Sequence, residues 1–263
     1  MLGAIIIIVI AVLLTKLIIY LSENSLDNHI DKSQNEKERL EQLNKRVQSD
    51  ICSINIEETR EGEAEERYIE SELQRQNFPK RVLRDMYIPY NGETKQIDVL
   101  LLTQFGIYVI ESKDYSGWIF GSLNSKIWTQ SLNKNNRYKF YNPIWQNNSH
   151  IKALCTYLHS KCEYFNLEDD DFYSLIIFSG KAELKKIPQN LVDCKVINDY
   201  ELNDYINYEN MNKPQIFTEE QLDKFYNILL PTTQVSDEVK QKHIENVKKY
   251  QIKNSWQLSQ EWL

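Results

Sequence analysis

The chain has 263 residues, with 31 Lys and Arg against 38 Asp and Glu, which gives a formal net charge of −7 at pH 7. This acidic balance argues against a general nucleic-acid binder. The four cysteines, Cys52, Cys155, Cys162 and Cys194, lack the spacing of a disulfide framework, so they are expected to be ordinary buried thiols.

The first expected element is a transmembrane anchor over residues 1–22. Residues 2–20 are almost purely apolar and reach the ~20 positions that a membrane-spanning helix needs, with Lys16 near one end. A cleaved signal peptide is the competing interpretation, but no basic stretch precedes the apolar run and no small-residue cleavage site follows it. Because the positive residues lie in or after the run, the positive-inside rule predicts a single-pass protein with its N-terminus outside and its body in the cytoplasm.

A polar helical stalk or linker is expected next, over residues 23–58. Leu40, Leu43, Val47 and Ile51 recur at three- and four-residue spacing, which favours a thin amphipathic helix. A solvated linker is the alternative.

The body then alternates helices and strands. A helix is expected over residues 62–76, because Ile69 and Leu73 fall on one face, with Glu66 one turn before them. Later elements follow from apolar runs and turn residues: strands at 81–90, 96–113 (a hairpin), 118–130 (a β pair), 172–180 and 194–198, and a helix that begins at Asn142-Pro143. This order favours an α/β or α+β layer structure.

Residues 211–263 are expected to form a C-terminal helical extension. Thr218 and Gln221 have capping-box spacing ahead of a periodic apolar segment. A long charged helical tail follows from Ser236.

The candidate site lies on the hairpin "QIDVLLLTQFGIYVIESK". If its loop is centred between Gln104 and Phe105, Asp98 falls directly opposite Glu111, and Lys113 shares the face of Glu111. Directly opposed Cβ atoms lie ~5 Å apart, where two like charges are destabilising unless something neutralises them.

Two carboxylates on an otherwise apolar element predict a bound cation, because an unpaired buried charge is costly. Oxygen ligands of this kind suit Mg²⁺ or Mn²⁺, which also take ligands from substrate phosphates. A neighbouring lysine can orient or deprotonate the attacking water, or stabilise charge on the phosphate. The alternative is a salt bridge of Lys113 with one carboxylate at the edge of the sheet.

The surrounding motifs resemble a known family. "QID", followed thirteen residues after its aspartate by "ESK", resembles the bipartite signature of the restriction-endonuclease-like PD-(D/E)xK superfamily. Gly62 and Glu66 ahead of "YIESEL", then "QIDVLLLTQFGIYVIESKDYSGWIFG", "IWTQ" and "YNPIWQNNSHIKAL", resemble the nuclease-related domain family, NERD. The resemblance implies one restriction-endonuclease-like α/β domain over residues 59–210, with a mixed central sheet flanked by helices.

The resemblance also implies roles for individual residues. Asp98 and Glu111 would bind the metal, with the backbone carbonyl of Ser112 as a third ligand, and Lys113 would be the catalytic lysine. Glu66 matches the helical glutamate that helps to hold the metal. The sequence departs from the pattern at Glu65, where a glycine is common, and at Ile97, where a proline is common.

Gln146 matches the glutamine of the Asn-Pro-x-x-Gln stretch, and its implied role is contact with the substrate or with Lys113. A capping or solvated glutamine is the alternative.

Residues 81–152 hold nine Lys and Arg against five Asp and Glu, unlike the acidic flanks. Within this region, Lys134, Arg137 and Lys139 with Tyr138 could hold a nucleic-acid strand, and a solvated loop is the alternative interpretation.

Two histidines and two cysteines, His150, Cys155, His159 and Cys162, share one helical segment and mimic zinc-ligand spacing. Four ligands from one helix cannot surround a tetrahedral ion, so core and surface roles are favoured.

The sequence therefore predicts a membrane-anchored nuclease that uses Mg²⁺ or Mn²⁺ to hydrolyse phosphodiester bonds, with DNA as the expected substrate. The alternative is a non-catalytic, membrane-tethered module on the same fold that binds nucleic acid or protein.

Overall fold

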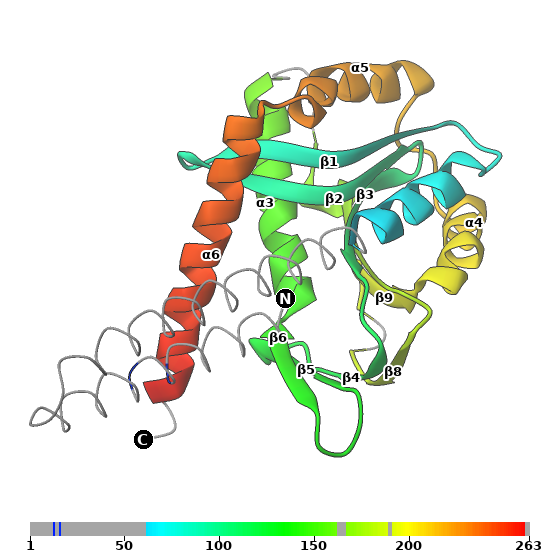
Figure 1. Cartoon of the computed structure of the whole chain (residues 1–263). Coiled ribbons are helices and arrows are strands. Elements are labelled where there is room, and N and C mark those ends of the chain that lie inside the picture. Colours follow the sequence, from blue (N-terminus) through cyan, green and yellow to red (C-terminus); the bar gives the residue numbers. More distant parts are fainter. Residues whose placement is uncertain (1–12, 14–15, 17–61, 162–166, 189–190, 261–263) are drawn as a thin grey trace, which may run out of the picture.

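The computed structural model describes residues 62–161, 167–188 and 191–260, together with Leu13 and Lys16 (Figure 1). The expected anchor at 1–22 and stalk at 23–58 otherwise lie outside the described residues, as do Cys52 and Cys162. Among the residues that are described, no helix is both long and apolar enough to cross a membrane.

A five-stranded mixed sheet forms the centre of the body, as the expected α/β class requires. Its strands lie in the order β1-β2-β3-β7-β9; β1, β2 and β3 are antiparallel, and β7 and β9 run parallel to β3. β3 is therefore an interior strand with a neighbour on each side. The strands are β1 (Lys80–Tyr90), β2 (Glu93–Thr103), β3 (Gly106–Lys113), β7 (Phe172–Phe178) and β9 (Cys194–Asn198).

The β2–β3 hairpin has the predicted register. Its loop consists of Gln104 and Phe105, and Val99 pairs with Ile110 at the last paired position away from the loop. Helices cover both faces of these strands, which explains why their residues are almost continuously apolar rather than alternating.

The segment between β3 and α3 forms a second sheet together with β8, where one central sheet was expected. Four strands lie in the order β6-β5-β4-β8: β4 (Gly117–Phe120), β5 (Ile127–Ser131), β6 (Arg137–Tyr141) and β8 (Ala182–Lys186). The predicted β pair is β4–β5, but β6 and β8 were not predicted. Gly117 leads into this sheet with φ +74°, and a Cβ there would lie 2.6 Å from the carbonyl oxygen of Ser131, so this position requires glycine.

Helices pack on both faces of the first sheet (Figure 1). α3 (Pro143–Lys161) and α5 (Glu219–Leu229) share one core with β1, β2 and β3. The helix over residues 62–74 and α4 (Leu202–Asn212) share a second core on the opposite face, which buries Ile69 and Leu73 completely, as their spacing predicted.

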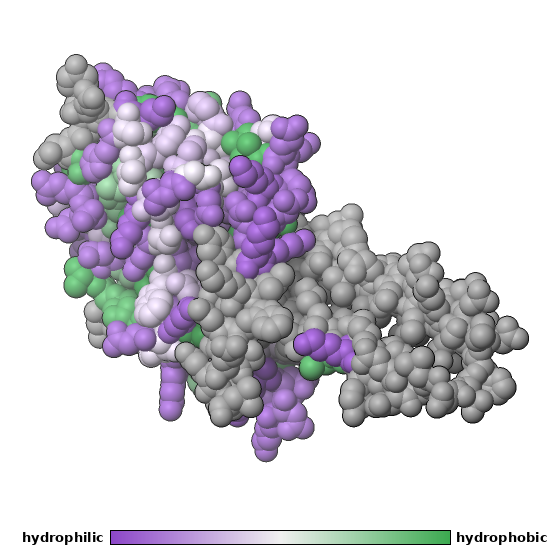
Figure 2. Space-filling model, turned by 90° about the vertical axis from the view of Figure 1, so that its left-hand side faces the viewer, coloured by the Kyte–Doolittle hydropathy of each residue, from purple (hydrophilic) through white to green (hydrophobic). Residues whose placement is uncertain are grey.

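The C-terminal segment is partly integral to the domain. α5 carries the predicted capping box, in which the Gln221 N–H donates to Thr218 Oγ1 at 3.2 Å. Its Leu222 and Phe225 are fully buried in the core beneath α3, so α5 belongs to the domain rather than to a peripheral extension. α6 (Asp237–Gln260) is the predicted charged helix and lies beside β1 and β2 (Figure 1). Figure 2 shows that hydrophilic residues dominate the described part of this side of the molecule.

Candidate active site

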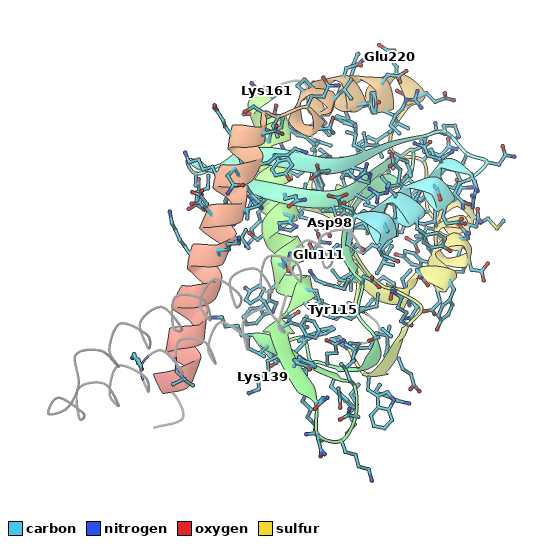
Figure 3. The ribbon with its side chains drawn as sticks, viewed as in Figure 1. Asp98, Glu111, Tyr115, Lys139, Lys161 and Glu220 are labelled. Atoms are coloured by element: carbon cyan, nitrogen blue, oxygen red, sulfur yellow. The ribbon has the colours of Figure 1, made fainter. Side chains whose placement is uncertain are left out.

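Asp98 and Glu111 lie on adjacent strands just beyond the Val99–Ile110 pair, as the register predicted (Figure 3). On the other side of β2, Arg84 pairs with Val99 and Met86 with Ile97, so Asp85 of β1 occupies the position across from Asp98. Three carboxylates on three neighbouring strands therefore lie at one level of the sheet.

The two strands β1 and β2 are irregular at this level. Leu83 and Met86 of β1, which are three residues apart, both face the core beneath α3, and so do their partners Leu100 and Ile97 of β2. Regular alternation would place such residues on opposite faces. Asp85 has φ +53°, a conformation that non-glycine residues adopt sparingly. The break in side-chain alternation thus occurs where Asp85 and Asp98 lie on these two strands.

Lys113 lies at the end of β3 and contacts two predicted site residues. Its Nζ forms an ion pair with Glu111 Oε1 and lies 3.4 Å from Gln146 Oε1 of α3. Glu111 is fully buried and Lys113 is only 7% exposed. The ion pair considered as the alternative interpretation therefore exists, but it lies on an interior strand rather than at the edge of the sheet.

Asp98 is held against the backbone of β3. Its Oδ2 accepts a hydrogen bond from the Ser112 N–H at 2.8 Å. Ser112 is thus adjacent to both predicted carboxylate ligands, and the role of its carbonyl oxygen remains a prediction.

α3 is anchored over the site by a side chain that the sequence did not single out. The amide Nδ2 of the buried Asn147 donates to the Val109 carbonyl at 2.7 Å and to Ser174 Oγ at 2.9 Å. These two bonds attach α3 to β3 and β7, and they place Gln146 above Lys113.

His150 is a site residue that sequence reasoning missed, because it was grouped with the nearby cysteines. Its Nδ1 lies 3.3 Å from Glu111 Oε2, and neither of these buried atoms has a hydrogen-bond partner. Its spacing of i+4 from Gln146 on one helix was the available signal. His159 instead contacts Cys155 Sγ and the Leu167 carbonyl.

The pKa values of the two carboxylates, Asp98 and Glu111, are shifted in opposite directions. Burial, Glu111 and Glu66 raise the pKa of Asp98 well above its usual value. Burial would raise the pKa of Glu111 too, but Lys113 and His150 outweigh it and lower that pKa. Burial would lower the pKa of Lys113, but the charge of Glu111 outweighs it, so the ammonium form is favoured. Negative charge around Asp98 is therefore only partly neutralised by the protein.

Glu66 extends from the helix over residues 62–74 toward the same region. Its Oε2 lies 3.8 Å from Arg84 Nη1, and burial followed by the charge of Asp85 raises its pKa to about 7. Glu63, three residues before it on the same helix, is exposed and pairs with Arg67 at 3.2 Å. The structure therefore places Glu66, not Glu63, within electrostatic range of Asp98 and Glu111.

The donor set fits a divalent cation of the Mg²⁺ type. No three His, Cys, Asp or Glu side chains of the described residues are arranged so that they could hold an ion by themselves. Mg²⁺ is usually bound through one or two carboxylates and completes its shell with waters and substrate phosphates. The buried Oε2 of Glu111 has no hydrogen-bond partner, and a cation beside Asp98 would satisfy it.

These carboxylates predict a pH-dependent stability of the metal-free protein. The folded-state pKa of Glu66 is about 7, above its usual 4.5, so its contribution is fully present below about pH 4.5 and is lost as the pH rises through about 7. The free energy of unfolding in EDTA should fall by on the order of 1–3 kcal/mol between pH 5 and pH 7.5. Denaturant unfolding of the parent and of Glu66→Gln measures the share of Glu66 in this loss. The variant should lose less stability than the parent over this pH range, and the raised pKa values of Asp98 and Glu65 account for the loss that remains. Equal slopes for the two proteins would contradict the assignment.

The predicted basic residues lie elsewhere. Lys134, Arg137 and Lys139 are exposed on the hairpin formed by β5 and β6. Figure 3 shows Lys139 on this second sheet, apart from Asp98 and Glu111. The structure does not bring these residues into the carboxylate site, and their contact with a nucleic acid stays a prediction.

Comparison with known proteins connects this site to a family. The model of the nuclease-related domain, NERD, matches residues 61–179, from the helix that carries Glu66 to the end of β7, and thus confirms the resemblance. An uncharacterized protein of Bacillus anthracis is 28% identical over 160 residues, which cover 61% of this chain and 69% of that protein. No solved structure matches the chain.

Proposed function

Because residues 61–179 belong to the nuclease-related domain family, we propose that this protein is a metal-dependent nuclease that hydrolyses phosphodiester bonds, with DNA as its substrate. The observation that carries the proposal is the junction of Asp98, Glu111 and Lys113 at the end of β3. Two carboxylates and one ammonium group converge there, and one buried carboxylate oxygen, Glu111 Oε2, lacks a hydrogen-bond partner.

Asp98 and Glu111 are the proposed ligands of Mg²⁺ or Mn²⁺, together with the Ser112 carbonyl oxygen, and Glu66 supports them from its helix. When bound, the metal supplies positive charge that polarises the phosphodiester and lowers the pKa of an attacking water. The carboxylates contribute the negative charge that holds the metal at the end of β3.

Lys113 is proposed to stabilise the negative charge that develops on the phosphate. Its raised pKa favours the ammonium form, which suits this role better than that of a general base. Gln146 Oε1, 3.4 Å from its Nζ, orients the ammonium group.

The order of elements supports a restriction-endonuclease-like core. The helix over residues 62–74 precedes the antiparallel strands β1, β2 and β3, and α3 then leads to the parallel strand β7. Asp98 and Glu111 lie just beyond the point at which the pairing between β2 and β3 ends, at Val99 and Ile110.

Cleavage by the purified full chain in mild detergent tests the function. We expect labelled DNA to be cut with Mg²⁺ or Mn²⁺ and to remain intact with EDTA. Glu111→Gln should abolish cutting, while Glu183→Gln, which changes an exposed glutamate on β8, should not. Metal-independent cutting, or equal cutting by Glu111→Gln, would overturn the proposal. DNA binding without any cutting would favour a non-catalytic binding module instead.

The proposal also includes a membrane tether at residues 1–22 and a cytoplasmic body. It is supported by the apolar run and by the distribution of Lys and Arg after it. Cell fractionation of the chain without residues 1–22 tests the tether, and retention of that shortened chain in the membrane fraction would refute it.

A further inference from the structure

A hollow lies along α3, the helix that carries Gln146 and His150 of the candidate active site. Its volume is about 320 Å³, and it is lined by Tyr90 from the end of β1 and by Trp145, Asn148, Ser149 and Lys152 from α3. The catalytic scheme above uses none of these residues.

The hollow adjoins the site through α3. Trp145 directly precedes Gln146, whose Oε1 lies 3.4 Å from Lys113 Nζ. Trp145 and Lys152 are seven residues apart and share one stripe of the helix, while Gln146 and His150 share the neighbouring stripe that faces Glu111. A ligand in the hollow would therefore lie along the stripe of α3 that adjoins the stripe of Gln146 and His150.

Trp145 is held in place with part of its ring exposed. Its Nε1 donates to the Leu123 carbonyl at 2.9 Å, and its ring meets that of Tyr141 edge to face with centroids 6.4 Å apart. The side chain remains 37% exposed. An exposed ring that is already ordered loses little entropy when a flat ligand stacks on it.

The chemistry of the lining matches a nucleotide unit. Nucleobases stack on aromatic rings such as those of Tyr90 and Trp145 without sequence preference. The exposed amide of Asn148 and the hydroxyl of Ser149 can donate and accept hydrogen bonds at the edge of a base. The exposed ammonium group of Lys152 can pair with a phosphate.

We propose that this hollow is a subsite for an unpaired nucleobase and its adjoining phosphate. The inference rests on the proposed nuclease function and narrows its substrate to a nucleic acid with a single-stranded segment beside the scissile bond. A base inside a duplex cannot enter, because its faces are covered by stacked neighbours and its edge is paired.

Equilibrium binding of the full chain to labelled DNA tests the subsite. Ca²⁺, which takes oxygen ligands like Mg²⁺, replaces it so that binding is measured apart from cleavage. Trp145→Ala should weaken binding of a single-stranded oligonucleotide by about 5- to 150-fold, the equivalent of ~1–3 kcal/mol for one stacked base. Blunt duplex should change by less than about threefold.

Three further variants separate stacking from folding. Trp145→Phe retains a ring and should keep most of the affinity. Trp118→Ala, which removes an indole 50% exposed on β4, should bind as the parent does. Lys152→Ala removes only an exposed side chain and should lower the slope of log affinity against log salt by about one.

These binding measurements separate failure of the subsite proposal from failure of the proposed nuclease function. Parental affinity in both Trp145→Ala and Lys152→Ala would overturn the subsite and leave the nuclease proposal standing. Equal weakening for single strands and duplex would overturn the selectivity for an unpaired base. A parent that neither binds nor cuts any DNA would overturn both proposals. If Trp145→Ala fails to fold, the salt slope of Lys152→Ala and the affinity of Trp145→Phe still decide.

Discussion

Lys113→Ala is expected to lower the rate of DNA cleavage by about 10²–10³-fold, the loss that removal of one positioned charge-stabilising donor typically causes. Lys113 contacts Glu111 and Gln146 but is not a proposed metal ligand. Mg²⁺ affinity should therefore be retained or increased, because Glu111 loses a competing cation. Cleavage kinetics and calorimetric titration with Mg²⁺ measure the two effects separately.

The matched control for this variant is Lys224→Ala, which removes an exposed lysine that pairs with Glu220 on α5. It should cleave and bind Mg²⁺ as the parent does. Thermal unfolding in Mg²⁺ checks that Lys113→Ala is folded, because the change leaves Glu111 buried without its ammonium partner. Normal cleavage by folded Lys113→Ala would show that the assigned mechanism is wrong.

Asp98→Asn is expected to abolish Mg²⁺ binding and cleavage while stabilising the metal-free protein. The neutral amide can still accept the Ser112 N–H bond, but it removes a carboxylate whose pKa is raised by burial, Glu111 and Glu66. Because that carboxylate ionises at a cost in the folded state, its penalty is absent at low pH and grows as the pH rises. The gain at pH 7.5 should be about 0.5–2 kcal/mol, the range that single stabilising substitutions commonly give.

Denaturant unfolding in EDTA at pH 5 and pH 7.5, beside calorimetry with Mg²⁺, tests this variant. The stabilisation should be larger at pH 7.5 than at pH 5. Asp114→Asn serves as a control, since its carboxylate pairs with Lys181 and is not a proposed ligand. A destabilised Asp98→Asn that still binds Mg²⁺ would mean that Asp98 is structural and is not a ligand of the cation.

Lys113→Ala and Asp98→Asn together distinguish a residue that acts on the phosphate from one that binds the metal. Loss of cleavage with retained metal binding identifies a group that acts on the phosphate, whereas loss of both identifies a metal ligand. A purely structural ion pair between Lys113 and Glu111 predicts neither pattern, because removal of Asp98 would then change no metal response.

Local features of the candidate site could be predicted from the sequence because strand alternation and a short turn determine them. The two-residue loop at Gln104 and Phe105 places Asp98 at the level of Glu111, and alternation brings Lys113 to the same face. The start of α3 was predictable for a similar reason: Asn142 Oδ1 accepts the Ile144 N–H at 2.9 Å, with Pro143 at the first helical position.

The second sheet and the position of α5 were not predictable in this way. β8 is short and charged, and its pairing with β4 joins segments far apart in the chain. Likewise, Leu222 and Phe225 show that α5 has an apolar face, but not which surface that face covers. Such contacts depend on how the elements pack rather than on local periodicity.

What the sequence by itself determined is the hairpin that brings Asp98, Glu111 and Lys113 together, since residues close along one hairpin have few ways to meet. The tertiary structure alone decided that Asp85 lies across from Asp98 in the sheet, that Glu66 comes within electrostatic range of both ligands, and that His150 lies against Glu111. Those three residues come from other elements, and their approach is set by the irregularity in β1 and by the anchoring of α3 on the sheet. Side-chain spacing within one element carries no information about either.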